Sequence, residues 1–196
     1  MMRGRPKKFS DEEIFAGAMR ALARHGRANV TLADIAAEVD VTAGALTQRF
    51  GTKRALLLWV MERFSMAVPA VFAGLRTSSR SPLDTIFAYG RSMANLGASP
   101  EALSHTLGWL QAELTDPEFR ELLLAQSRAT RRELRKLIED GVRDGELVAS
   151  TPGAALARLI DSTVSGSLVT WAVHQQGSCT AWVQRDLQFL LQPWKC

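Results

Sequence analysis

Residues 31–50 read TLADIAAEVDVTAGALTQRF, and their pattern predicts two short helices joined by a tight turn. Apolar residues recur at helical spacing over 32–39 and again over 43–50, so each segment has one face to bury. Asp40 falls where the turn needs a left-handed residue, and Asp tolerates that conformation better than most residues other than glycine. The arrangement is typical of a helix-turn-helix, although pairs of short helices also occur in many proteins that never contact DNA.

The outer face of the second helix carries the candidate contacts with DNA. Small residues at its start would let the helix lie close to the floor of the major groove, and longer residues further along would reach base edges or phosphates. Arg49 is suited to guanine, and Lys53, at the start of the next helix, is suited to a phosphate. The candidates on this face are Ala43, Gly44, Ala45, Thr47, Gln48 and Arg49.

The positive charge of the chain is concentrated at the same end. The 196 residues have a formal net charge of +4. Lys and Arg outnumber Asp and Glu over residues 1–54 and balance them in the remainder, so the whole excess lies in the first quarter of the chain. A basic arm before the first helix adds Arg5, Lys7 and Lys8 to the candidate DNA contacts. A basic segment joined to a neutral domain is expected of a protein that binds nucleic acid.

Capping signals mark the expected starts of helices along the whole chain. Ser10 and Thr31 each precede a segment with an acidic residue three positions on, as in a capping box. Later starts place proline at the first helical position behind a capping side chain. We therefore expect an all-α fold, with a helix-turn-helix domain over 1–52 and a larger helical domain over 53–196. The nine expected helices span 11–25, 32–39, 43–50, 53–75, 82–97, 100–114, 117–142, 152–176 and 180–191.

The larger domain is expected to bind a small molecule. Several large side chains lie on helices that would surround a central cavity, and as a group they favour an apolar or aromatic ligand. For each of them, ordinary core packing is the more common role. The helix over 53–75 is apolar nearly all round and links the two domains, so we expect a ligand to act through it. The candidate ligand contacts are Trp59, Phe64, Phe87, Met93, His105 and Trp109. The polar segment 74–81 is predicted to be a loop and a domain edge.

The last two helices are expected to pair two copies of the chain. Each carries an apolar stripe at helical spacing, and a palindromic DNA site would require two recognition helices related by a two-fold axis. The alternative is that the stripes pack only within their own subunit. The candidate interface residues are Leu156, Ile160, Val164, Ser167, Trp171, Trp182, Leu187 and Leu190.

The stretch around the turn resembles the tetracycline-repressor (TetR) family. The matching positions are Thr31, Ile35, Ala36, Val39, Val41, Thr42, Gly44, Leu46, Phe50, Lys53 and Leu56. The resemblance implies an all-α homodimer, a repressor that a small-molecule effector releases from a palindromic double-stranded operator. It also implies that Thr31 and Thr42 contact DNA beside the outer face of the second helix. Thr47 stands where the family usually has Tyr, and Asp40 where it usually has Gly, so a weaker backbone contact and some strain in the turn are expected.

Other functions fit the sequence less well. The three histidines lie far apart, and the chain has no Gly-rich phosphate loop and no metal-ligand spacing at Cys179 and Cys196, so we expect no enzyme, cofactor or metal site. A DNA-bending protein would not need so large a neutral domain, but a C-terminal domain that binds a protein, or has no effector, stays open. No secretory signal and no apolar run of about 18–20 residues is evident, so we expect a cytoplasmic protein that does not enter the membrane.

Overall fold

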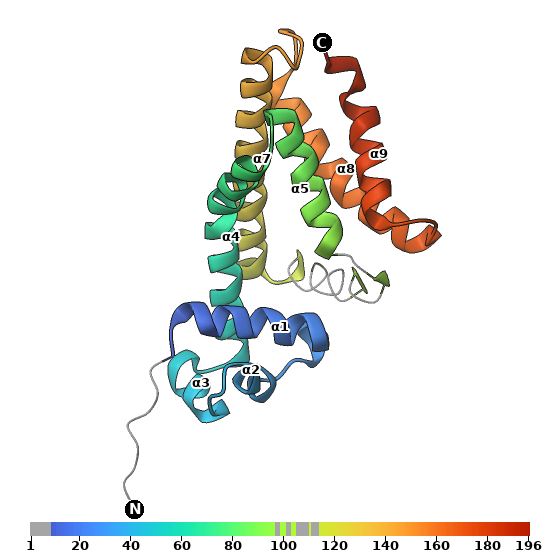
Figure 1. Ribbon diagram of the computed structural model, residues 1–196. Coiled ribbons are helices and arrows are strands. Elements are labelled where there is room, and N and C mark those ends of the chain that lie inside the picture. The colour runs from blue at the N-terminus through green and yellow to red at the C-terminus, as the bar shows by residue number, and fades with distance from the viewer. Residues whose placement is uncertain (1–8, 97–98, 101–102, 105–109, 111–113) are drawn as a thin grey trace, which may run out of the picture.

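The computed structural model describes residues 9–96, 99–100, 103–104, 110 and 114–196, and the described residues are almost entirely helical (Figure 1). An isolated antiparallel bridge joins Leu147 to Lys195. The predicted all-α fold is confirmed. The helices are α1 (Asp11–Asn29), α2 (Leu32–Glu38), α3 (Ala43–Phe50), α4 (Lys53–Ser78), α5 (Pro82–Leu96), α7 (Pro117–Arg143), α8 (Gly153–His174), α9 (Cys179–Leu191) and the 3-10 turn η1 (Gln192–Trp194). Much of the expected helix over 100–114 lies outside the described residues.

Side-chain caps explain where most of these helices begin. Ser10 and Thr31 form the predicted capping boxes of α1 and α2, and Thr42 caps α3 by accepting a hydrogen bond from the backbone N–H of Ala45. The start of α8 differs from the prediction. It begins at Gly153, one residue later than expected, and has no side-chain cap. The Thr151 hydroxyl donates to the Val148 carbonyl at 2.6 Å.

Two boundaries differ from the sequence pattern. The regular part of α1 ends near the expected position because Gly26 has a φ of 67°, and one further turn then carries the helix to Asn29. The predicted loop over 74–81 is confined to residues 79–81, and the predicted domain edge there is wrong. Helix α4 continues to Ser78, and the side chains on either side of the short connection, Leu75 and Leu83, pack against the same hydrophobic core.

Two hydrophobic cores divide the molecule. The smaller core joins α1, α2, α3 and the first half of α4, and the larger joins the second half of α4 to α5, α7, α8 and α9. Helix α4 therefore spans both, with Val60 fully buried in the first and Phe72 in the second (Figure 1). By length and composition α4 is also the one described helix apolar enough to cross a membrane, with a mean hydropathy of 1.5 over the best window. Its apolar residues fill two protein cores, as those of a buried linking helix do.

The packing of α1 on α2 depends on a glycine. An added Cβ at Gly17 would lie 2.3 Å from Cγ2 of Val39, a stiff β-branched side chain. We therefore expect Gly17→Ala to lower the free energy of unfolding by about 1–3 kcal/mol, the usual effect of overpacking a core. Denaturant unfolding measures this loss. The double variant Gly17→Ala, Val39→Ala should recover part of it, and an equal loss with and without the second change would contradict the clash.

Candidate nucleic-acid interface

The turn between α2 and α3 has the geometry of a helix-turn-helix. Asp40 has a φ of 56°, so the predicted left-handed residue is confirmed, and the Val41 N–H donates to the Ala36 carbonyl at 3.0 Å across the corner. Leu46 is fully buried and fixes α3 against the smaller core. The outer face of α3 is therefore left free to meet a partner.

The residues on that outer face differ in exposure and in whether they already have a hydrogen-bond partner. Gly44, Thr47 and Gln48 are exposed, whereas Ala43 and Ala45 are half-buried. The Thr47 hydroxyl donates to the Ala43 carbonyl at 3.0 Å, so it already has a partner within its own helix. Gln48 is thus an exposed amide on the recognition helix, of the kind that pairs with adenine.

The flanking candidates lie close to the ends of α2 and α4. The exposed Thr31 hydroxyl donates to the carboxylate of Asp34 at 2.7 Å, and this bond and a further one from the Thr31 backbone N–H lower the pKa of Asp34. Lys53 is the first residue of α4 and is half-buried. Arg5, Lys7 and Lys8 lie outside the described residues.

Arg49 is placed differently from the prediction. Its guanidinium forms an ion pair with Asp11, in the first turn of α1, and so is not directed freely at a base. Asp11 also accepts a hydrogen bond from Arg63 of α4 at 2.9 Å, and Arg63 bonds Glu12 at 2.9 Å as well. Sequence reasoning missed this network, since each of its ion pairs joins residues 38 or more positions apart.

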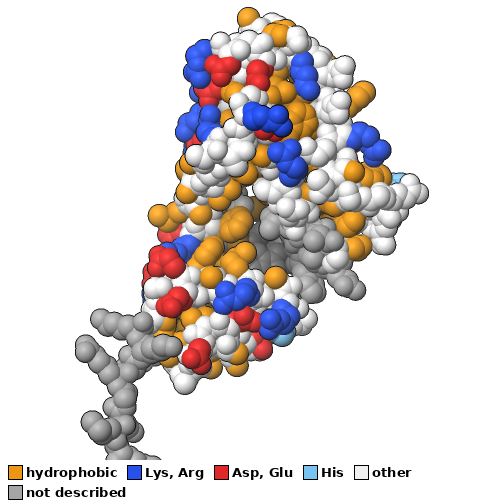
Figure 2. Space-filling view, in the orientation of Figure 1, with side chains coloured by type: hydrophobic (Ala, Val, Ile, Leu, Met, Phe, Trp, Pro, Cys, Tyr) orange, Lys and Arg blue, Asp and Glu red, His pale blue; other side chains and the backbone are white. Residues whose placement is uncertain are grey.

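Acidic and basic side chains alternate over the N-terminal part of the surface. Figure 2 shows them intermixed over the lower half of this face, where α1, α2 and α3 lie, with no continuous basic surface among the side chains drawn in colour. Over residues 9–54 six Lys and Arg balance six Asp and Glu, so the excess of positive charge lies in residues 1–8 of the sequence. Basic side chains on this surface are paired with acidic ones, as Arg20 and Arg24 are with Glu38. The hydrogen bond from Arg20, followed by the charge of Arg24, outweighs desolvation and lowers the pKa of Glu38.

Trp59 belongs to the smaller core, which contradicts its prediction as a cavity residue of the larger domain. Its ring lies 5.1 Å from that of Phe50 and 6.5 Å from that of Phe15. The Arg63 guanidinium lies 5.1 Å from the same ring. Trp59 therefore fixes α4 to α1 and to the end of the recognition helix. The apolar surface of α4 extends nearly all round, so the sequence alone did not reveal which core this residue joins.

The first turn of α7 forms a second link between the two parts of the molecule. Phe119 is 1% exposed and is buried in the smaller core, although the rest of α7 packs in the larger one. The Arg27 guanidinium lies 3.8 Å from the Phe119 ring. Arg54 of α4 donates to both carboxylate oxygens of Asp116 at 2.9 Å and pairs with Glu118, and these acids raise the pKa of Arg54. The contact between Arg54 and Asp116 joins residues 62 positions apart, and no local pattern in the sequence indicates it.

The remaining candidate ligand contacts are scattered. Phe64 is half-buried on α4, four residues from Val60 in one core and four from Val68 in the other. Met93 is half-buried against the larger core. Phe87 also packs there, with the Lys195 ammonium 5.3 Å from its ring, so it faces the C-terminal tail. His105 and Trp109 lie outside the described residues.

A polar cluster inside the larger domain was not predicted. The Asp161 carboxylate of α8 accepts from Arg131 at 3.0 Å and, at 3.5 Å, from the Tyr89 hydroxyl. Tyr89 is buried and stacks on Phe72, with 5.2 Å between ring centroids. Burial, followed by the nearby charge of Asp161, raises the pKa of Tyr89 far above its usual value. The cluster joins α5, α7 and α8.

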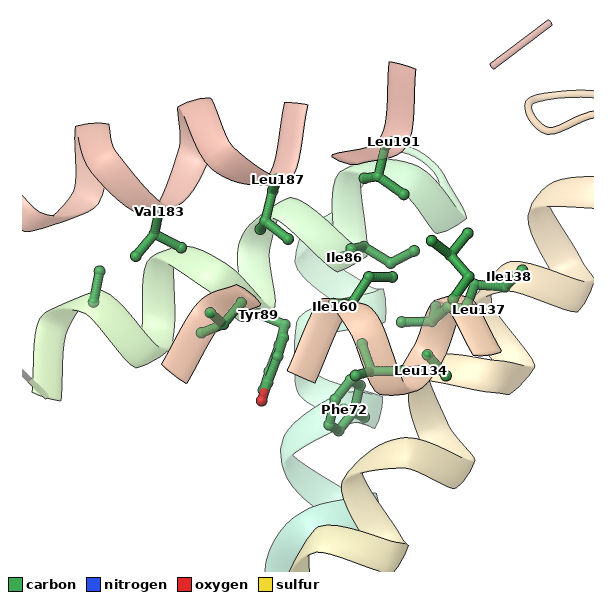
Figure 3. Packing of buried hydrophobic residues seen from close by; sticks show 14 of the residues in the cluster. Phe72, Ile86, Tyr89, Leu134, Leu137, Ile138, Ile160, Val183, Leu187 and Leu191 are labelled. Carbon is green, nitrogen blue, oxygen red and sulfur yellow. The ribbon is translucent and has the colours of Figure 1, made fainter. Parts of the chain in front are cut away.

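The predicted dimer stripe is buried within its own subunit. Figure 3 shows Ile160 and Leu187 directed into the core among side chains of α4, α5 and α7. Trp182 and Leu190 are half-buried against the same core. The buried members of the stripe already fill the space between helices of one chain, which contradicts their assignment to a contact between copies. The half-buried Trp182 and Leu190 stay candidates for that contact. The residues that the core buries are Leu156, Ile160, Val164, Ser167, Trp171 and Leu187.

The opposite face of the last two helices is exposed and apolar. Leu159, Val169 and Val173 of α8 are 40%, 41% and 76% exposed, and Phe189 of α9 is 83% exposed. An added Cβ at Gly166, on the same face, would meet nothing within 4 Å. Helices α8 and α9 lie at the side of the molecule away from α4 (Figure 1). Sequence reasoning recognised that α8 and α9 carry apolar stripes but chose the inner one.

The construction of the N-terminal part is that of the helix-turn-helix regulators. Residues 14–60 match the family described as "Bacterial regulatory proteins, tetR family". A curated relative, the HTH-type transcriptional regulator BetI of Agrobacterium fabrum, is 32% identical over 120 residues, which are 60% of this chain and 57% of the relative. The match thus spans little more than half the length of that relative. The likeness to the tetR family is therefore carried by the helix-turn-helix part of the chain.

Solved structures share the whole fold. NemR of Escherichia coli in its reduced form has a TM-score of 0.73 at 18% identity and covers 92% of this chain and 95% of its own. A TetR transcription regulator from Haloarcula marismortui has a TM-score of 0.70 at 19% identity, covering 94% and 96%. FadR of Bacillus subtilis, in complex with stearoyl-CoA, has a TM-score of 0.67 at 15% identity, covering 92% and 97%. BetI, FadR and the Haloarcula marismortui protein are each named as transcriptional regulators.

Proposed function

We propose that this protein is a homodimeric repressor that binds a palindromic operator and leaves it when a small, largely apolar molecule binds the larger domain. The observation that carries the proposal is the exposed outer face of α3, held by the buried Leu46 and the Thr42 cap in the orientation of a recognition helix. Gln48 reads bases in this proposal, and the small residues at the start of α3 permit close approach to the groove.

The exposed apolar face of α8 and α9 supports the dimer. Val169, Val173 and Phe189 would be covered by the same residues of a second copy across a two-fold axis. Ser162 and Gly166, small residues on that face, permit close approach of the two α8 helices. A two-fold dimer places two recognition helices about 34–36 Å apart, which matches two half-sites one helical turn apart.

The two helices that span both cores support regulation by a ligand. Because α4 and α7 each pack in the smaller and the larger core, a molecule that changes the packing of the larger core moves the DNA-binding part as well. Phe64, half-buried between the two cores, is a candidate contact for that molecule. The FadR relative was solved with stearoyl-CoA, a molecule with a long apolar tail, and an apolar ligand fits the residue types here. Ligand binding then favours a dimer in which the distance between the two recognition helices does not match the operator.

Selection of duplexes from a random pool tests the proposed function. We expect the wild-type protein to enrich a palindromic sequence. Gln48→Ala should then reduce the preference for that sequence over random duplex by about 2–6 kcal/mol, because each of the two subunits loses one bidentate base contact worth about 1–3 kcal/mol. Binding titrations on both duplexes measure the ratio. Failure to enrich any sequence would overturn the function, and an equal loss on both duplexes would show that Gln48 does not read a base.

A further inference from the structure

We propose that Asp11 forms an ion pair with Arg49 in the free protein and that a DNA phosphate replaces Asp11 as the partner of Arg49. Arg49 then binds the DNA backbone and reads no base. This inference rests on the proposed DNA-binding function. It assigns a role to the ion pair between the last turn of the recognition helix and the first turn of α1. Asp11 is in this sense an internal substitute for the phosphate, and it lowers the affinity of the protein for every duplex.

The exposure of the pair permits the exchange. The side chain of Arg49 is 35% exposed and that of Asp11 is 40% exposed, so both groups are partly hydrated and a phosphate oxygen can approach the guanidinium. Exposed ion pairs contribute little to stability, because water and salt screen them. A contact between arginine and phosphate is charge-assisted and bidentate, as is one with a carboxylate, so one anion can replace the other.

Asp11 keeps a partner when Arg49 leaves. Arg63 donates to Asp11 at 2.9 Å and also to Glu12 at 2.9 Å, and its guanidinium lies 5.1 Å from the Trp59 ring, which holds it in place. The carboxylate is therefore not left unpaired by the exchange. It also remains in the first turn of α1, where the helix dipole favours a negative charge. These contacts lower the free-energy cost of separating Arg49 from Asp11.

The position of Arg49 suits the DNA backbone. Gly44, Thr47 and Gln48 lie on the exposed face of α3, and Arg49 follows directly, at the end of the helix. Asp11 opens α1, immediately after the segment that leads from the basic arm. An arginine at the end of the recognition helix, paired with the first turn of α1, is placed to meet a phosphate at the edge of the groove. In this position it adds affinity without sequence preference.

Two neutralising substitutions separate this role from a general effect of charge. Asp11→Asn and Glu12→Gln each remove one negative charge from the same turn of α1, and each loses a contact with Arg63, but only Asp11 contacts Arg49. We expect Asp11→Asn to bind both the enriched operator and random duplex about four- to twenty-fivefold more tightly than Glu12→Gln, because a two- to fivefold effect of one exposed ion pair acts in each of the two subunits. Fluorescence titration with the full-length protein measures both affinities.

The salt dependence of binding supplies the second measurement. Arg49→Gln should lower the slope of log affinity against log salt concentration by about 1.8, because each of the two subunits loses one phosphate contact worth about 0.9. In the Arg49→Gln background, Asp11→Asn and Glu12→Gln should have equal affinities, because the competition is gone. Arg49→Lys, which keeps the charge, should restore the slope. Thermal unfolding of each variant checks that the fold is intact.

Several outcomes would overturn the proposal while leaving the proposed function in place. If Asp11→Asn binds more weakly than Glu12→Gln, the ion pair positions α3 instead of restraining Arg49. If Arg49→Gln leaves the salt slope unchanged, Arg49 does not contact a phosphate, and this result does not depend on the folding of any Asp11 variant. A loss for Arg49→Gln on the operator alone would show that it reads a base. Failure of the wild-type protein to bind any duplex would instead overturn the proposed function.

Discussion

Replacing Val173 and Phe189 together by aspartate is expected to leave a folded monomer that no longer holds its operator. The two side chains are 76% and 83% exposed in one chain, so charges there do not enter its core. In a two-fold dimer the four aspartates would be desolvated and would repel one another. Sedimentation should then give the mass of a single chain, 21.5 kDa. Operator affinity should fall by a factor of about 10²–10⁴, the usual gain from linking two binding units.

Val71→Asp is the matched control for this double variant. Val71 is 51% exposed on α4, away from α8 and α9, so it tests the effect of a charge on another apolar part of the surface. We expect it to remain dimeric and to bind the operator normally. A dimer that persists after both aspartates are introduced would exclude this face as the interface. A wild-type protein that sediments as a monomer would overturn the proposed dimer altogether.

Phe119→Ala is expected to have the largest effect of any single substitution on the smaller core. The ring is 1% exposed, and its removal leaves a cavity between α1, α4 and α7 as well as the loss of the Arg27 contact. Phe-to-Ala changes in cores typically cost about 3–5 kcal/mol. Denaturant unfolding followed by circular dichroism measures the loss, and operator binding should weaken as the DNA-binding part loosens.

Leu124→Ala, one and a half turns further along the same helix, provides the comparison. Leu124 is 39% exposed, so its truncation should change the free energy of unfolding by no more than about 0.5 kcal/mol. Phe119→Leu keeps most of the buried volume and should fall between the two. If Phe119→Ala is no more harmful than Leu124→Ala, the first turn of α7 does not fasten the DNA-binding part, and α4 alone joins the two cores.

The features that the sequence predicted correctly are local ones. Ser10, Thr31 and Thr42 act within three residues of themselves, so the cap and the start of each helix are visible in a short stretch of sequence. The left-handed Asp40 and the buried Leu46 follow from the same local pattern. For this reason the helix-turn-helix and its exposed face were predicted from residues 31–50.

The contacts that the sequence missed are distant or ambiguous. Trp59 lies on a helix that is apolar nearly all round, and only the tertiary packing decides which core it joins. Helix α8 has two stripes, and the more continuous one, which includes Ile160 and Trp171, fills the subunit's own core. The outer stripe is interrupted by the small residues Ser162 and Gly166, so its hydrophobic pattern in the sequence is weaker. The pairing of Arg49 with Asp11 crosses 38 positions, and no local pattern indicates it.

Phe119 also affects how DNA-binding parts can be exchanged between related regulators. The residue belongs by sequence to the larger domain, yet it fills the core of the smaller one. In a chimera joined at residue 52 or 60, the Phe119 ring would come from one parent and the smaller core around it from the other. The transferable unit is therefore discontinuous: it comprises the residues of the smaller core up to Met61 together with the turn that includes Asp116 and Phe119. Chimeras that transplant both segments should retain the stability of their parents.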